Sequence, residues 1–172
     1  MLRIIAVIAL TVMTAGCTGG RVEPTMTKDE ALARVEELIN DTVAIIEPRP
    51  RLDVDPTTLT PYRCIGFVGD DWDGRIYISR AYWLRGIPRD KTKLLEISQK
   101  VRRHWQQQGH VIEGISKDGM NIAARSRPDG FILSLSWTAG DVLGIGATSP
   151  CIWPHGTPEP SPSSELDVRV AH

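Results

Sequence analysis

The sequence predicts an α+β domain in which two helices pack on one face of a mainly antiparallel sheet. Two segments have helical apolar periodicity, and the last third of the chain alternates apolar and polar residues between short turns. Asp-Gly and Gly-Asp pairs in such turns are typical of β-hairpins. Hairpins with separate helices indicate the α+β class. The expected order of elements is αββαββββ.

The first helix is expected to begin at Thr27, because Thr27 and Glu30 form a capping-box pattern. Apolar residues then recur at three- and four-residue steps, namely Leu32, Val35, Leu38, Ile39, Val43 and Ile46. The helix is expected to end near Glu47, since Pro48 and Pro50 follow. The proline-rich segment 48–61 is predicted to be a loop.

Two strands are expected next, at 62–69 and 75–84. In the second, Ile76, Ile78 and Leu84 alternate with Arg75, Tyr77 and Ser79, which indicates two different faces. Residues 86–92 then open a second helix, with one apolar stripe formed by Leu94, Ile97, Val101 and Trp105. Gly109 stands where a glycine commonly ends a helix.

The last four strands are predicted from a change of period to two. The segments are 110–116, 120–126, 131–138 and 142–152, separated by turns that contain glycine. In the third, one face is formed by Phe131, Leu133, Leu135 and Trp137, and the other by Ser134, Ser136 and Thr138. This alternation predicts a sheet with one buried face.

The N-terminal segment has the pattern of an export signal. Arg3 precedes the apolar run 4–13, and the small residues Ala15 and Gly16 follow. The run is too short to cross a bilayer, which needs about 20 residues. Thr14-Ala15-Gly16-Cys17 resembles the lipobox of bacterial lipoproteins, which implies that Cys17 is acylated and becomes the first mature residue. The alternative is an ordinary secretory signal with a chance cysteine.

The expected organisation is a signal peptide at 1–16, a lipidated cysteine and flexible tether at 17–26, and a single domain at 27–153. The tail 154–172 is rich in Pro, Ser and charge and is expected to be disordered. The chain has 20 Lys+Arg and 21 Asp+Glu, and loss of Arg3 leaves 19 against 21, a net charge of −2. Without a basic excess, nucleic acid is not expected as a partner.

Three cysteines are present, and Cys17 is accounted for by the lipid. Cys64 and Cys151 remain as an even pair in an exported domain, so we expect a disulfide that ties the first strand of the domain to its last. Two free thiols are the alternative.

No catalytic, metal or cofactor site is expected. The segment around Asp71, Asp73 and Gly74 begins like a calcium loop, but Gly69 and Arg80 stand where ligands are needed. The glycines near Gly144 lack the spacing and the lysine of a phosphate loop. His104 and His110 are six residues apart, unlike a helical metal pair, and no Ser–His–Asp or Cys–His arrangement can be assembled.

Aromatic and polar residues suggest a binding face instead. Trp105 and Trp137 are expected in the core, whereas Trp83 and Tyr77 lie on the outer face of their strand. The candidate binding face consists of Tyr77, Trp83, Arg125, Ser134, Ser136 and Thr138. In the alternative interpretation, tryptophans such as Trp72 and Trp153 cap sheet edges or cover the disulfide.

The motifs together suggest a family. The "TAGC" segment, the Tyr-x-Cys of Tyr62 to Cys64, the "WTAGDVLGIGATSPCIWP" segment and the Pro-rich tail resemble small envelope lipoproteins of actinobacteria. They are similar in layout to the LppA-like group. The resemblance implies a lipid-anchored, disulfide-linked domain on the outer side of the plasma membrane, and it supplies no catalytic residues.

The expected function is therefore a non-enzymatic binding or accessory module of the cell envelope, with an envelope protein, glycan or lipid as partner. The alternative is a hydrolase acting on wall or lipid material, which needs two carboxylates, or a His and a nucleophile, in one cleft. A sensor or an immunity-type protein is also left open by the sequence.

Overall fold

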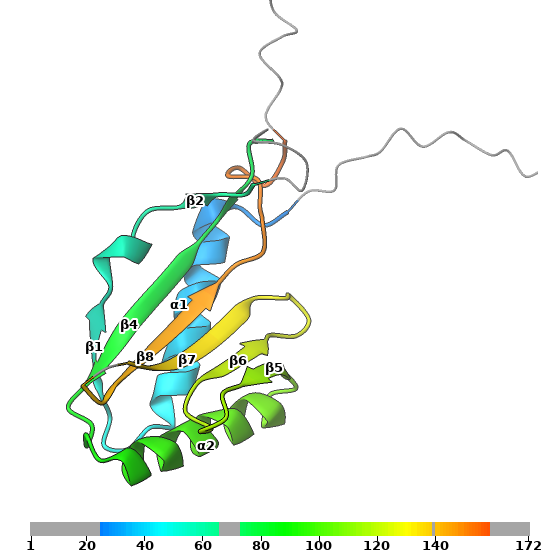
Figure 1. Ribbon diagram of the computed structural model, residues 1–172. Coiled ribbons are helices and arrows are strands. Elements are labelled where there is room, and N and C mark those ends of the chain that lie inside the picture. Colours follow the sequence, from blue (N-terminus) through cyan, green and yellow to red (C-terminus); the bar gives the residue numbers. More distant parts are fainter. Residues whose placement is uncertain (1–24, 66–72, 139, 159–172) are drawn as a thin grey trace, which may run out of the picture.

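The computed structural model describes residues 25–65, 73–138 and 140–158, and it has an α+β fold with two helices and a six-stranded antiparallel sheet (Figure 1). The elements in chain order are α1 (Lys28–Ala44), β1 (Arg51–Val54), a 3-10 turn (Pro56–Thr58), β2 (Tyr62–Arg63), β3 (Ile76–Tyr77), β4 (Ser79–Arg85), α2 (Lys91–Gln107), β5 (Val111–Ile115), β6 (Ile122–Arg125), β7 (Ile132–Thr138) and β8 (Val142–Thr148).

The large sheet has the strand order β1-β4-β8-β7-β6-β5, and every neighbouring pair is antiparallel. Strands β5 to β8 form a meander of consecutive hairpins. The last strand, β8, then pairs with β4 from the N-terminal half and so joins the two halves of the chain. Strands β2 and β3 form a separate two-stranded ribbon.

Both helices cover the same face of the sheet (Figure 1). Helix α1 packs on β4 and β8, and α2 packs on β5 and β6. The predicted apolar stripe of α2 is buried, and Trp105 is only 1% exposed. Its indole N–H donates to the Thr42 hydroxyl of α1 at 2.8 Å, so the two helices share a buried hydrogen bond. The predicted inward face of β7 is also confirmed, because Leu133 and Leu135 are each 1% exposed.

The capping box of α1 is confirmed. The Thr27 hydroxyl accepts from the Glu30 N–H, and the Glu30 carboxylate accepts from the Thr27 N–H. The helix ends at Ala44, three residues before the expected Glu47, and the Ile46 N–H donates to the Val43 carbonyl in a tighter final turn.

The prediction of a loop over 48–61 was wrong. This segment contains β1, which pairs with β4, and the 3-10 turn. Leu52 and Val54 alternate with charged residues, and β1 is an edge strand, the place where flanking prolines are tolerated in a sheet. The prolines therefore bound a short strand and do not exclude one.

The two strands expected at 62–69 and 75–84 also differ from the structure. Of the first, β2 is the described strand, and residues 66–72 lie outside the described part of the chain. The second is divided into β3 and β4 at Ile78, where the Ile78 N–H donates to the Ser149 side chain instead of a strand carbonyl. The predicted order therefore has too few strands before α2, although Ile76, Ile78 and Leu84 are buried as expected.

The Cys64–Cys151 disulfide is confirmed, with the two Cα atoms 6.1 Å apart. Cys64 directly follows β2, and Cys151 lies in the segment after β8. The disulfide therefore ties β2 to the end of the last strand, and the first strand of the domain is β1, which was not predicted. At this end of the molecule the Thr25 N–H also donates to the Gly156 carbonyl at 2.8 Å. The N-terminal and C-terminal segments of the described chain therefore lie side by side (Figure 1).

Candidate binding face

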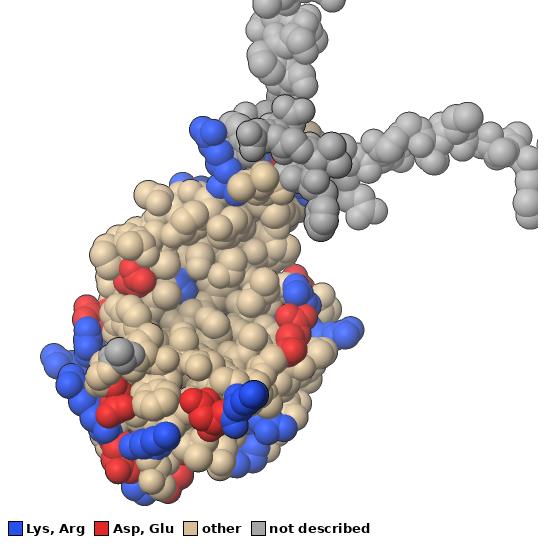
Figure 2. Space-filling model, in the orientation of Figure 1, with Lys and Arg blue, Asp and Glu red and all other residues tan. Residues whose placement is uncertain are grey.

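The sheet face opposite the helices carries the candidate site, and within the described residues no helix covers it. In Figure 2 the centre of this face is hollowed and mostly uncharged, and most of the Lys, Arg, Asp and Glu side chains lie toward its edge. We call it the open sheet face. It is formed by the outward residues of β4, β8, β7 and β6.

The strand register places the outward residues of this face in rows that cross the sheet. The first row is Trp83, Gly144 and Ser136; the second is Ala81, Gly146, Ser134 and Ala123; the third is Ser79, Thr148, Ile132 and Arg125. The second row has no side chain larger than serine, so the sheet backbone is most accessible there.

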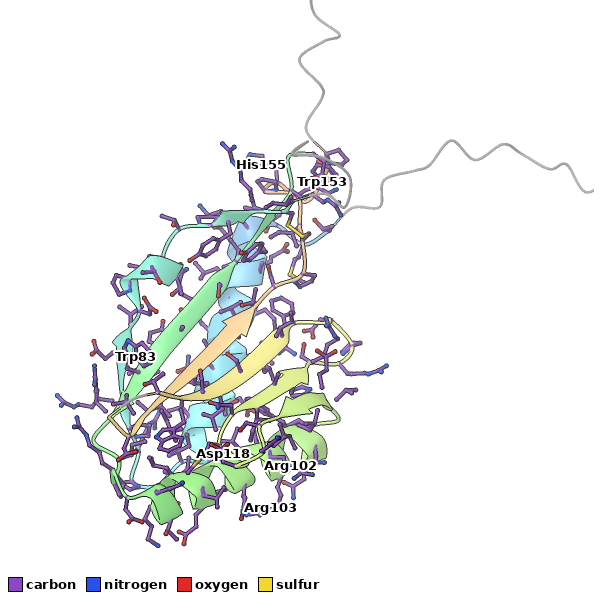
Figure 3. All side chains as sticks on the ribbon, viewed as in Figure 1. Trp83, Arg102, Arg103, Asp118, Trp153 and His155 are labelled. Carbon is purple, nitrogen blue, oxygen red and sulfur yellow. A yellow bond between two sulfur atoms is a disulfide. The ribbon has the colours of Figure 1, made fainter. Side chains whose placement is uncertain are left out.

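Gly144 determines where the Trp83 indole lies. A Cβ atom at Gly144 would be 3.2 Å from Cζ3 and 3.3 Å from Cε3 of Trp83, which is closer than ordinary van der Waals contact. The absence of that atom lets the indole rest against the backbone of β8. The Trp83 side chain therefore forms one border of the open sheet face, on β4 next to β1 (Figure 3).

Gly146 keeps the centre of the face hollow. A Cβ atom there would be 3.0 Å from the Ser134 hydroxyl oxygen and 3.2 Å from the Arg80 carbonyl oxygen. The resulting cavity has a volume of about 170 Å³, and its lining includes Asp55, Trp83, Ser134, Ser136 and Gly146.

Two serine hydroxyls in the lining of this cavity are available to a ligand. Within residues 25–65, 73–138 and 140–158, neither the Ser134 hydroxyl nor the Ser136 hydroxyl has a hydrogen-bond partner. The Ser79 and Thr148 hydroxyls, one row away, are instead paired with each other at 2.9 Å. Polar groups that are exposed and unpaired on a recessed surface fix the orientation of ligands in protein sites.

Two further cavities extend the open sheet face. One, of about 660 Å³, lies near the disulfide and is lined by Ile132, Pro150, Cys151 and the rings of Tyr62 and Tyr77 among others. The two tyrosine rings stack with centroids 5.0 Å apart. The other, of about 320 Å³, shares Ser134 and Ser136 with the cavity beside Trp83.

Four of the six predicted binding-face residues line these cavities: Tyr77, Trp83, Ser134 and Ser136. Arg125 points outward but forms an ion pair with Glu113 of β5 at 2.5 Å. The Thr138 hydroxyl donates to the Val142 carbonyl in the β7–β8 hairpin. These two residues lie at the edge of the face.

Sequence reasoning missed Asp55, Gly144, Gly146 and Tyr62. The two glycines alternate with apolar residues of β8, and that alternation was the available signal that both lie on the outer face. Asp55 and Tyr62 carried no such signal, because one lies in the predicted loop and the other pairs with Tyr77 only in the folded ribbon.

The other tryptophans belong elsewhere. Trp137 packs against the core, and Trp153 is 8% exposed beside the Arg75 guanidinium. Trp72, like Cys17, lies outside the described residues. Trp83 is therefore the aromatic side chain of the cavity at the centre of the open sheet face.

A fourth cavity, which is polar and has a volume of about 380 Å³, lies between α1 and the end of α2. Its lining includes Arg34, Glu37, Asp41 and His110. His104 Nε2 lies 2.6 Å from Asp41 Oδ2 at this helix junction. Burial lowers the pKa of His110. In the described part of the chain, no group of three His, Cys, Asp or Glu side chains is arranged to hold a metal ion.

Asp129 connects the β6–β7 turn to α1. Its Oδ2 accepts from Arg34 Nε at 2.6 Å, and its Oδ1 accepts from the Ser126 hydroxyl. Burial by itself raises the pKa of Asp129, but these hydrogen bonds outweigh burial and hold the pKa below its ordinary value. The carboxylate is therefore charged at neutral pH and stabilises the turn.

Comparison with known proteins finds no matching protein-family model, no matching curated protein and no matching solved structure. Among the helices of the described residues, none has the length and apolar character needed to span a membrane.

Proposed function

We propose that this protein is a lipid-anchored lipoprotein on the outer side of the plasma membrane, and that its open sheet face binds a component of the cell envelope without catalysis. The observation that supports binding is the hollow beside Trp83, where an indole and two unpaired serine hydroxyls face the same cavity. The resemblance of Thr14–Cys17 to a lipobox and the layout similar to LppA-like lipoproteins support the location.

The position of the N-terminal end of the described chain is consistent with such an anchor. The Trp153 N–H donates to the Thr25 hydroxyl at 2.8 Å, so Thr25 is attached to the end of the domain that carries the disulfide. Eight residues, 17–24, precede it and reach at most about 29 Å when extended. Anchoring at Cys17 would therefore keep this end of the domain close to the membrane surface.

The binding proposal is tested by co-sedimentation of the mature chain with isolated envelope material. Trp83→Ala and Ser136→Ala are expected to reduce the bound fraction, because each removes a group that faces the cavity. Arg103→Ala is the matched control, since Arg103 is exposed on α2, away from the open sheet face (Figure 3). Equal sedimentation of all four proteins would contradict the proposed face.

The second candidate function is hydrolysis of wall or lipid material. The contact of His104 with Asp41 beside the polar cavity favours it, because a carboxylate next to a histidine is a common arrangement for general base catalysis. Asp41→Asn would then abolish release of soluble products from envelope material. Release that is absent in the wild type, or unchanged in Asp41→Asn, would remove this candidate.

A further inference from the structure

We infer that the ligand of the open sheet face is a neutral glycan chain lying along β4, β8 and β7. This inference rests on the proposed binding function and adds the chemical class of the ligand. It is argued from the charge of the cavity linings, from the unpaired hydroxyls and from the aromatic rings at the two ends of the face.

The cavity linings disfavour an anionic ligand. Of the residues that line the three cavities of the open sheet face, Asp55 alone is charged. Its Oδ1 accepts hydrogen bonds from the Thr57 N–H and the Thr57 hydroxyl. A phosphate or an acidic peptide would meet this carboxylate without a cation to balance it. An uncharged ligand incurs no such repulsion.

The serine hydroxyls distinguish a glycan from an acyl chain. A hydrocarbon lying over Ser134 and Ser136 would remove both hydroxyls from water and leave them unpaired, which is unfavourable. Sugar hydroxyls both donate and accept, so they replace the lost water on the same two groups. Asp55, on the other side of the Trp83 cavity, provides further acceptor oxygens.

The aromatic groups suit the C–H faces of sugar rings. Trp83 presents its indole over β8, and the stacked Tyr62 and Tyr77 rings lie toward the disulfide end. Tyrosine and tryptophan have an apolar ring with one polar O–H or N–H group, so their rings can contact an apolar surface in a site that stays open to water. The outward positions from Ser79 to Trp83 span about 14 Å along β4, which is the length of a short oligosaccharide.

A protein strand is a poorer occupant. β8 is hydrogen-bonded to β4 on one side and to β7 on the other, so its backbone is already paired. An added strand would have to pair with a free sheet edge, as in β-augmentation, and the hollow lies on the face of the sheet. A ligand on this face is therefore bound through side-chain hydroxyls and aromatic rings, and not through backbone hydrogen bonds.

The test is isothermal titration of the mature chain with neutral hexasaccharides of glucose, galactose, mannose or xylose. A hexasaccharide of galacturonic acid and phosphatidylglycerol vesicles are the charged and lipid probes. At least one neutral sugar is expected to bind and to shift tryptophan emission. Trp83→Ala is expected to weaken that binding about tenfold or more, while Trp83→Phe retains most of it. Arg103→Ala should bind like the wild type.

The double variant Ser134→Ala/Ser136→Ala provides a second measurement, because removal of two outward hydroxyls leaves the core unchanged. It is expected to weaken sugar binding and to leave the melting temperature within a few degrees of the wild type. Thermal unfolding of each variant separates loss of binding from loss of folding.

The outcomes separate the two proposals. Binding of a neutral sugar that depends on Trp83 supports both. If envelope sedimentation depends on Trp83 but every neutral sugar fails to bind, or the vesicles bind in their place, the glycan inference is overturned and the proposed binding function stands. If neither sedimentation nor titration responds to Trp83→Ala or to the serine double variant, both proposals are overturned.

Discussion

Reduction of the Cys64–Cys151 disulfide is expected to cause a large loss of stability through the unfolded state. The two cysteines are 87 residues apart in the sequence, so the bond closes most of the folded chain into one loop. Native contacts near the bond remain without it. The Cys64 N–H donates to the Arg75 carbonyl at 3.0 Å, and Ile76 forms a β-bridge with Ile152.

The magnitude follows from the entropy of closing that loop. In the chain-entropy model, a cross-link over about 88 residues lowers the entropy of the unfolded chain enough to contribute about 4.6 kcal/mol at 25 °C. For a folded region of about 130 residues, the unfolding entropy converts this into a fall of about 17 °C in melting temperature. The native backbone is expected to keep its fold.

The assay is urea unfolding of the mature chain with Cys17→Ser, with and without reductant, so that the only difference is the disulfide. The free energy of unfolding is expected to fall by about 4–5 kcal/mol on reduction, and the urea dependence to steepen as the unfolded chain expands. The control is Cys64→Ala/Cys151→Ala, which should not respond to reductant. A loss below about 1 kcal/mol would refute the loop-entropy reasoning for this protein.

Three further predictions concern a buried hydrogen bond, acid stability and the anchor. Thr42→Val leaves the buried Trp105 N–H without its acceptor and should cost about 1–3 kcal/mol in urea unfolding, whereas Thr42→Ser keeps the hydroxyl and should cost less. The folded pKa of Asp129 lies below its ordinary value of 3.8, so the unfolded carboxyl takes up a proton first and the free energy of unfolding should fall as pH drops below about 4. Asp129→Asn should flatten that part of the pH profile; an unchanged profile would show that another carboxyl is responsible. Cys17→Ser should move the protein from the membrane fraction to the soluble fraction, and retention of the variant in membranes would indicate anchoring by the uncleaved apolar segment.

Much of the candidate face followed from strand periodicity alone. Because side chains alternate between the two faces of a strand, Ser134 and Ser136 were predicted to lie opposite Leu133 and Leu135, and Trp83 opposite Leu84. The structure confirms this division of inner and outer residues. Periodicity does not report what lies beside a residue on the next strand, so it did not identify Asp55 or Tyr62 as lining residues.

The short strands of the N-terminal half were harder to predict. β1 has four residues and β2 and β3 have two each, so none is long enough to show a clear period of two. Their strand geometry comes from pairing with partners that are distant in the chain, such as Asp53 with Trp83 and Tyr62 with Tyr77. For β1 the local composition, which is rich in proline, favoured a loop instead, whereas β2 and β3 lie within segments that were predicted as longer strands.

The sequence by itself determined the α+β class, the inward face of the long strands, the cap of α1 and the pairing of Cys64 with Cys151. Each of these depends on local periodicity, local hydrogen bonds or a count of cysteines. Only the tertiary structure decided that β8 lies between β4 and β7, which places Gly144 beside both Trp83 and Ser136. The physical reason is that a pairing between strands some 60 residues apart is selected by packing of the whole sheet, and no local pattern records which strand will become the neighbour.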